Sequence, residues 1–179
     1  MGRLGERYRE TVTSAPDPHP RHLHAPHATV VEHEVWVAAP PHDVWQVVAD
    51  PRNLPLWDRH IAGVEGVPPG GLALGTEYVT VVRIVAVSVH VPARVVELEV
   101  DRRSRILLDG VIEAEIETNL LPDGNGTLLR QRVAFRFRGG PLGEFVARAV
   151  RMTGAPHLLR HGMEAQKRQV EVELRRRGE

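Results

Sequence analysis

The sequence predicts a single α+β domain in which a curved, seven-stranded antiparallel sheet wraps around one long C-terminal helix. Three observations indicate this fold class: apolar and polar residues alternate in several runs, short turn-rich segments separate these runs, and an apolar stripe of helical spacing follows them. With 179 residues, the chain is long enough for one domain that holds a core or an internal cavity.

The first strand is predicted over residues 29–38, where three valines and His33 alternate with two glutamates and Trp36. Two short helices should follow this strand. The first begins near Pro41, because proline presets φ at a helix start, and Asp50-Pro51 ends it. The second runs from Pro51 through Trp57.

Six further strands are predicted between residues 61 and 138, and their short connections favour antiparallel neighbours. The sequence DGNG at positions 123–126 is a strong hairpin signal between the last two. The predicted strands span residues 61–67, 76–85, 87–100, 105–109, 111–121 and 127–138.

The last two predicted strands carry opposite charges on one face and apolar residues on the other. Glutamates stand at positions 113, 115 and 117, and arginines at positions 130, 132, 136 and 138. We expect the two charged rows to pair across a solvent-facing surface.

The final helix is predicted over residues 142–175, because apolar residues recur there at steps of three and four. Gly154 and Pro156 lie in its middle, where the proline removes a main-chain hydrogen bond, so we expect a kink. The stripe consists of Leu142, Phe145, Ala149, Met152, Pro156, Leu159, Met163, Gln166 and Val170.

The predicted domain covers residues 29–175. It is preceded by a mobile tail of residues 1–28, which is rich in proline and histidine and lacks apolar periodicity. Residues 176–179 form a short C-terminal tail.

Composition excludes several functional classes. Lysine plus arginine equals aspartate plus glutamate at 23 each, which argues against a nucleic-acid surface or an anionic-membrane surface. The absence of cysteine excludes disulfides, thiolate catalysis and cysteine-ligated metals. No apolar run is long enough to span a bilayer and the N-terminus lacks a secretion signal, so we expect no membrane insertion and a cytoplasmic protein.

Three local sequences carry a resemblance to a known family. Residues 35–45 read VWVAAPPHDVW, residues 50–57 read DPRNLPLW, and Gly126-Thr127 is followed by GPLG at positions 140–143. These segments resemble the START-like (SRPBCC) superfamily, in particular its polyketide cyclase/dehydrase branch. The resemblance covers residues 29–175 and implies a helix-grip fold with an internal hydrophobic cavity between the sheet and the long helix. These motifs mark the scaffold and include no catalytic signature.

A ligand in such a cavity would meet the polar residues on the inner face of the sheet. His33 shares its strand face with valines, and it is either a core histidine bonded to a main-chain carbonyl or an acid/base group in the cavity. A guanidinium at Arg83 could stabilise an enolate. The candidate catalytic residues are His33, Tyr78, Arg83 and His90.

The candidate ligand-binding residues are mostly apolar, and Gln131 and Trp57 could equally be core packing. Between residues 87 and 100 both strand faces carry apolar side chains, so the direction in which His90 and Arg94 point is ambiguous. The predicted ligand-binding set is Val35, Trp57, Arg94, Ile112, Ala114, Ile116, Gln131, Val133, Phe135, Phe145, Met152, Pro156 and Leu159.

Two groups of histidines also suggest metal binding, but we assign no metal site and no cofactor. Four of them lie in the proline-rich tail, where no scaffold fixes their geometry: His19, His22, His24 and His27. The other group, His157, His161 and Glu164, shares one helical face and could supply three ligands, although a solvated helix face explains it as well.

Two functions are compatible with this interpretation. The first is assistance to the cyclisation or dehydration of a polyketide-like intermediate in secondary metabolism, as a cofactor-independent lyase or isomerase of the cyclase/aromatase type. The alternative is a non-catalytic carrier that transports or sequesters a hydrophobic natural product or lipid, for example for self-resistance. The expected partner is a hydrophobic or polycyclic small molecule. An acyl-carrier protein is a candidate partner, no nucleic acid is expected, and the chain is expected to be a monomer or homodimer.

Overall fold

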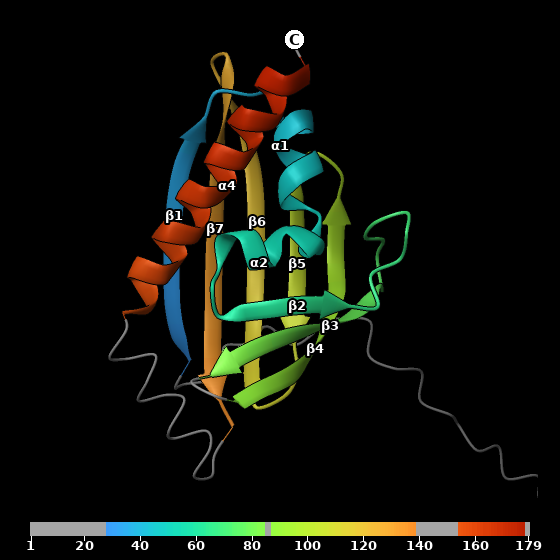
Figure 1. Cartoon of the computed structure of the whole chain (residues 1–179). Coiled ribbons are helices and arrows are strands. Elements are labelled where there is room, and N and C mark those ends of the chain that lie inside the picture. The colour runs from blue at the N-terminus through green and yellow to red at the C-terminus, as the bar shows by residue number, and fades with distance from the viewer. Residues whose placement is uncertain (1–27, 85–86, 139–153, 178–179) are drawn as a thin grey trace, which may run out of the picture.

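The computed structural model describes residues 28–84, 87–138 and 154–177. Within these ranges the chain forms a seven-stranded sheet, three short helical segments after the first strand, and a long C-terminal helix (Figure 1). The elements are β1 (Thr29–Val37), α1 (Pro41–Val48), the 3₁₀ helix η1 (Pro51–Asn53), α2 (Leu54–Trp57), β2 (Ile61–Glu65), β3 (Glu77–Ile84), β4 (Val87–Glu99), β5 (Arg103–Leu108), β6 (Ile112–Asp123), β7 (Gly126–Phe137) and α4 (Ala155–Arg177).

The strands lie in the order β1-β7-β6-β5-β4-β3-β2, and each neighbouring pair is antiparallel. β2 and β3 cross the lower end of the longer strands, and α4 runs diagonally over β1 and β7 (Figure 1). We call the face that α4 covers the concave face and the opposite one the outer face. The predicted α+β helix-grip fold is confirmed.

The turn between β6 and β7 brings the start of β7 against the end of β1. A side chain at Gly126 would collide with the carbonyl oxygen of Val37 and with the ring of Trp36. The neighbouring Thr127 Oγ1 donates a hydrogen bond of 2.7 Å to the carbonyl of Ala39. A glycine therefore permits the close approach that sets the pairing of β1 with β7.

Helix α4 begins later than the sequence predicts. Gly154 has a φ of 73°, which a right-handed helix does not contain, and α4 starts at the next residue. Pro156 thus lies in the first turn, where its missing N–H leaves no hydrogen bond unmade. Positions 142–153 lie outside the described residues, so the predicted kink at Gly154 and Pro156 stays a prediction. No helix in the described part of the chain is long and apolar enough to cross a membrane.

The outer face carries the charge pairs that the sequence predicts. Arg136 and Arg138 both donate to Glu113, and Arg132 Nη1 lies 3.4 Å from Glu117 Oε1. The pairing is confirmed, and within it Glu113 and Glu115 are buried while Arg136 and Arg138 stay exposed.

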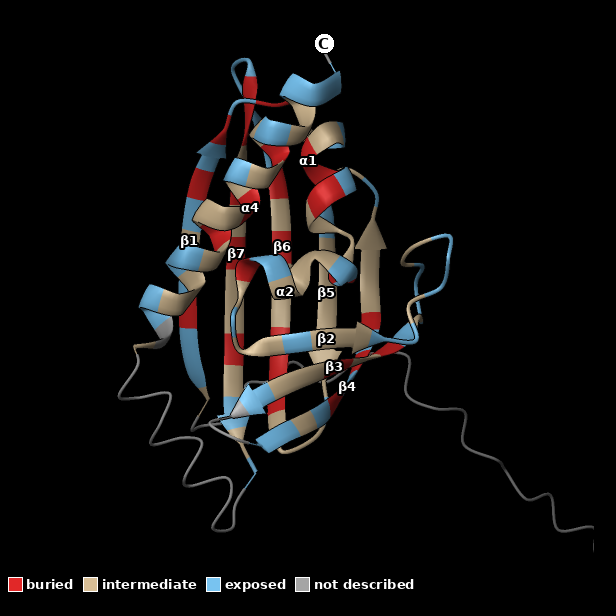
Figure 2. Ribbon diagram, in the orientation of Figure 1, coloured by how far each residue is buried: buried red, intermediate tan, exposed pale blue. Residues whose placement is uncertain are grey.

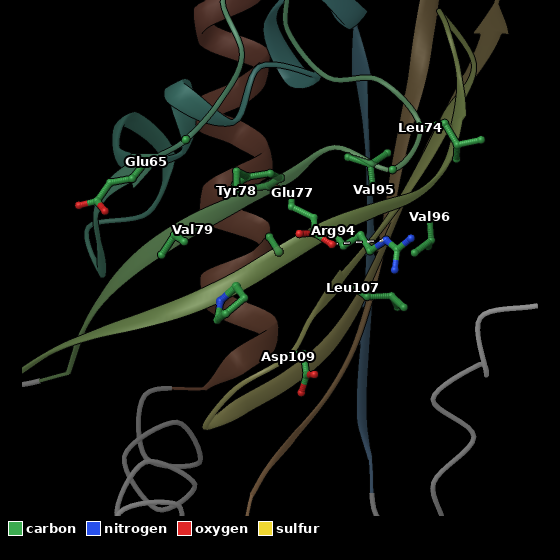
Figure 3. Close-up of a pocket in the computed structure, with 14 residues that line it drawn as sticks. Glu65, Leu74, Glu77, Tyr78, Val79, Arg94, Val95, Val96, Leu107 and Asp109 are labelled. Carbon is green, nitrogen blue, oxygen red and sulfur yellow. Dashed lines mark ion pairs between the residues drawn. The ribbon is translucent and has the colours of Figure 1, made fainter. Parts of the chain in front are cut away.

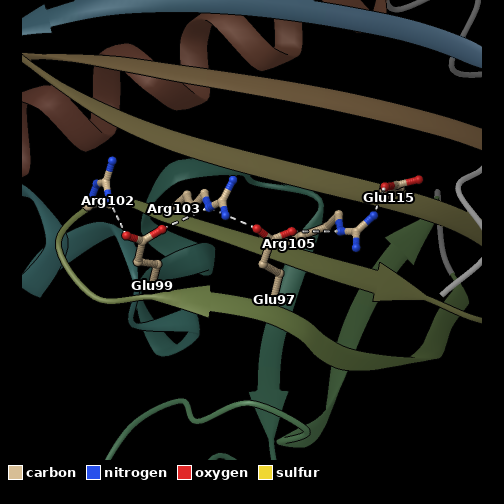
Figure 4. Close-up of polar contacts among 6 residues, drawn as sticks. All are labelled: Glu97, Glu99, Arg102, Arg103, Arg105 and Glu115. Carbon is tan, nitrogen blue, oxygen red and sulfur yellow. Dashed lines mark hydrogen bonds and ion pairs between the residues drawn. The ribbon is translucent and has the colours of Figure 1, made fainter. Parts of the chain in front are cut away.

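A second row of ion pairs joins β4, β5 and β6 on the same face (Figure 4). Arg105 contacts Glu97 at 3.4 Å and Glu115 at 3.1 Å, and Arg103 contacts Glu97 at 2.9 Å. Because each acid or base here has a counter-charge on the next strand, the outer face has an evident structural role.

Two closed apolar clusters lie on the concave side (Figure 2). The larger is built under α1 and α4 from Val35, Val37, Ala39, Val44, Trp45, Val47, Trp57, Leu120, Leu129, Met163 and Val170. The smaller contains Tyr78, Ala93 and Val95 on β3 and β4. The stretch of the concave face between these two clusters belongs to neither of them.

Candidate functional site

A row of polar side chains crosses the concave face between the two clusters. The strand registers pair His33 with Gln131, Gln131 with Thr118, and Thr118 with Ser104, on β1, β7, β6 and β5 respectively. Side chains of residues paired in this way point to the same face of the sheet. The four side chains therefore share one face of the sheet.

Helix α4 adds a fifth polar residue to this row. Gln166 Nε2 donates to Gln131 Oε1 at 3.4 Å, and Gln131 Nε2 donates to Thr118 Oγ1 at 3.3 Å. Gln131 and Gln166 are buried, with exposed fractions of 9% and 5%. The remaining amide oxygen of Gln166 is also buried, and it has no hydrogen-bond partner in the part of the chain that the structure describes. His33 is half-buried, and no polar partner of its imidazole is found in the described part of the chain.

The sheet beyond the polar row is apolar but not closed. Ile116 and Val133 are paired neighbours on the concave face, as are Ala114 and Phe135. Ile112, Ile116, Val133 and Phe135 stay half-buried and belong to neither closed cluster. Phe135 meets Phe137 edge to face, with ring centroids 5.8 Å apart. Large apolar side chains that remain half-buried on the inner face of a sheet are what a ligand-binding surface requires.

Tyr78 lies on the same face, on β3. Its Cα is paired with that of Ala93, and only 5% of the residue is exposed. Burial raises the pKa of the Tyr78 hydroxyl far above its ordinary value, so the group is a neutral hydrogen-bond donor at physiological pH. Four strands separate it from β1 in the sheet order, so Tyr78 and His33 share a face without being neighbours.

Three predicted site residues are on the other face. His90 is paired with Val81 and lies 4.0 Å from Glu65, Arg94 is paired with Glu77 and lies 3.9 Å from it, and Arg83 is exposed. The buried residues of β3, Tyr78 and Thr80, have the opposite parity and occupy the concave face. The prediction that Arg83, His90 and Arg94 line the cavity is therefore wrong, because valines on both faces of β3 and β4 conceal the orientation of these strands.

Some of the predicted ligand-binding residues belong to the closed core instead. Val35 lies in the larger cluster and Leu159 packs against it. Trp57 is buried in the same cluster, and its Nε1 donates to Gln169 Oε1 at 2.7 Å, which fastens α2 to α4. Pro156 is exposed in the first turn of α4, whereas Phe145 and Met152 lie outside the described residues.

The sequence did not indicate a hollow of about 1070 Å³ that is lined by residues of β3, β4 and β5 and of the connection between β2 and β3, Tyr78 among them. Figure 3 shows its lining, in which Glu65, Glu77 and Asp109 accompany Arg94 and Leu107. The hollow is open to solvent, and its apolar lining residues, such as Leu74 and Val96, alternate with three carboxylates that an apolar ligand would deprive of water. We therefore place the candidate site on the concave face.

The histidines of α4 form a pair. His157 Nε2 and His161 Nε2 are 2.8 Å apart on the exposed surface. No group of three or more metal-ligating side chains gathers among the residues that the structure describes. Among these residues, His157, His161 and Glu164 therefore do not gather into the three-ligand set that the sequence left open.

Comparison with known proteins places the chain in a family. Residues 28–171 match the family described as "Polyketide cyclase / dehydrase and lipid transport". The chain belongs to this family. None of the curated proteins compared with it matches.

Three similar structures illustrate the fold. A START superfamily protein from Mycobacterium smegmatis is 20% identical, with a TM-score of 0.58 over 79% of this chain and 97% of that one. The aromatase/cyclase Zhui from Streptomyces sp. R1128 is 20% identical, with a TM-score of 0.58 over 79% and 96%. Norcoclaurine synthase from Thalictrum flavum, solved as a point mutant with a transition-state analogue, is 17% identical, with a TM-score of 0.59 over 82% and 96%. At these identities the likeness establishes the shared fold.

Proposed function

We propose that the protein binds a hydrophobic small molecule between the concave face and α4, and that it assists cyclisation or dehydration of a polyketide-like intermediate there. The observation that carries this proposal is the half-buried apolar surface around Ile116, Val133 and Phe135, which lies between two closed clusters and is bordered by polar side chains. The family description and the similarity to an aromatase/cyclase support the same reaction class.

The proposed reaction requires little of the protein beyond positioning the substrate. The carbon between two carbonyls of a poly-β-ketone is already acidic, so a site that folds the chain into one reactive conformer removes much of the barrier. His33 would take the proton from that carbon, and the resulting enolate carbon would attack a carbonyl carbon of the same molecule. The new carbon–carbon bond leaves an alkoxide, which regains the proton from the imidazolium, and loss of water from this alcohol completes the dehydration.

Tyr78 fits the complementary role in this proposal. A neutral phenol buried on the concave face can donate a hydrogen bond to an enolate oxygen or alkoxide as its charge develops. Because burial holds its pKa above the ordinary value, Tyr78 is unsuited to act as the base. This leaves His33 for proton transfer, since Arg83 and His90 lie on the outer face.

Reconstitution of the reaction tests the proposal. We expect wild-type protein to change the distribution of cyclised products from a synthase-bound poly-β-ketone, and His33→Ala and Tyr78→Phe to shift it back toward the spontaneous mixture. Arg83→Ala is the matched control on the outer face and should behave as wild type. Identical products with and without wild-type protein would contradict the cyclase function.

A carrier function is the second candidate, and one observation favours it. Only two of the four predicted catalytic side chains lie on the concave face, and a carrier needs the surface without a positioned acid and base. In that case ligands would raise the midpoint of thermal unfolding without turnover. In either function we propose a cytoplasmic protein, a monomer or homodimer, that receives its ligand free or from an acyl-carrier protein.

A further inference from the structure

The buried amide oxygen of Gln166, which has no partner in the described part of the chain, lies beside the proposed ligand site. Gln166 is 5% exposed, and its buried amide oxygen has no partner among the described residues, while its amide nitrogen donates to Gln131. Native proteins pair nearly all buried polar atoms, because a buried acceptor that has lost its water and gained no donor is destabilising. An unpaired acceptor between a helix and the concave face is therefore a place where a polar group of a ligand can bind.

The chemistry of that group follows from the chain of hydrogen bonds. Gln166 donates to Gln131, and Gln131 donates to Thr118. Among the described residues this leaves the amide oxygen of Gln166 as an acceptor without a donor. If both amides were rotated by 180°, the links would run the other way and leave a donor on Gln166. A hydroxyl group satisfies either arrangement, because it both donates and accepts, whereas a ketone or an ammonium satisfies only one.

The surroundings of this point place the rest of the ligand. On β7, Val133 follows Gln131 on the concave face, and on β6, Ile116 takes the equivalent place beside Thr118, both half-buried. On the other side of the polar row, Leu129 and Leu120 are sealed in the larger cluster. His33, half-buried and paired in register with Gln131, borders the same point.

We propose that Gln166, with His33 beside it, binds a hydroxyl group of the ligand, and that the apolar body of the ligand lies over Val133, Ile116 and Phe135. The ligand class is therefore a hydroxylated aromatic or polycyclic compound, bound with its hydroxyl toward the closed cluster. The terminal bonds of the Gln166 side chain rotate easily, which lets the buried amide turn to meet the hydroxyl. This inference rests on the proposed ligand site.

A pair of matched ligands tests the inference. The dissociation constants of 2-naphthol and 2-methylnaphthalene, measured by equilibrium dialysis, compare a hydroxyl with a methyl group on the same ring system. The quantity compared is the dissociation constant of the methyl compound divided by that of the hydroxyl compound. This ratio should be about tenfold higher in the wild type than in Gln166→Met, because the thioether side chain of methionine offers no comparable hydrogen bond. Gln166→Leu is measured in parallel, so that the test does not depend on one variant folding.

Gln169→Met is the control variant, since Gln169 is a glutamine on the same helix whose amide is already bonded to Trp57 and Glu173. It should leave the ratio of the two constants at its wild-type value. An equal ratio in wild type and both Gln166 variants, with both compounds bound, would overturn the hydroxyl inference and leave the ligand site standing. Failure of the wild type to bind either compound would remove the ligand site and the inference together.

Discussion

The two ends of the concave face are built from the same strands but are closed to very different extents. At one end, Val37 and Leu129 have no exposed surface and lie in the cluster that Trp45 of α1 and Met163 of α4 complete. Further along β6 and β7, Ile116 and Val133 keep part of their surface. Strand alternation is the same at both ends, so the elements packed over the sheet determine which part becomes core and which can hold a ligand.

The largest expected effect is a difference in the free energy of unfolding between substitutions at the two ends of the concave face. Leu129→Ala should lower the free energy of unfolding by about 2–5 kcal/mol, because it leaves a cavity in a closed core. Ile116→Ala should cost only about 1–2 kcal/mol, since less contact is lost from a half-buried side chain. Urea denaturation of both variants measures the difference. Equal losses would mean that the region around Ile116 is packed as tightly as the core.

A smaller effect concerns the outer face and depends on pH. The hydrogen bond from Arg136, assisted by that from Arg138, holds the pKa of Glu113 below its ordinary value of 4.5, although burial acts in the opposite direction. The unfolded chain therefore binds the proton more readily than the folded one. The stabilisation is complete above about pH 5 and is lost as the pH falls through the lowered folded pKa.

Glu113→Gln isolates this contribution. The wild type should be more stable than the variant at neutral pH, and the difference should shrink progressively as the solution is acidified below pH 4.5. Urea denaturation at several pH values gives the curve. A stability difference that does not change with pH would show that the charge of Glu113 has no part in it.

The smallest expected effect comes from Arg94, whose predicted place in the cavity the structure corrects. Its side chain is 64% exposed and lies 3.9 Å from that of Glu77, which is 74% exposed. Arg94→Ala should change the free energy of unfolding by at most about 0.5 kcal/mol, because exposed ion pairs are largely offset by solvation. It should also leave the binding of 2-naphthol unchanged. Loss of naphthol binding in this variant would move the ligand site to the hollow that Arg94 lines.

Sequence patterns predicted the strands closely because period-two alternation and turn residues are local signals. The predicted strand at 127–138 is β7 to within a residue at each end, and the opposite charges on β6 and β7 pair as expected. The start of helix α4 at Ala155 was not predicted, because apolar periodicity carries no information on the positive φ of Gly154.

The candidate site was only partly predictable. His33 and Gln131 interrupt valine- and leucine-rich faces, so they were recognisable, but Arg83, His90 and Arg94 lie in strands that are apolar on both faces. Gln166 and Thr118 were missed, although both gave a signal. Each is a polar residue within an otherwise apolar row, and only the packing of α4 on β7 shows that the two rows meet at Gln131.

Gly126 limits how this protein can vary during evolution. Any side chain there would strike Val37 and Trp36 and push β1 away from β7. The pairing of these strands is also what sets His33 opposite Gln131, five residues along β7. A mutation at the hairpin would thus be selected against twice, through the fold and through the alignment of the polar row, whereas Gly124, with a φ of 59° and open space around it, can be replaced by asparagine at little cost. Gly126, a residue without a side chain, thus constrains both the fold and the register of His33 with Gln131.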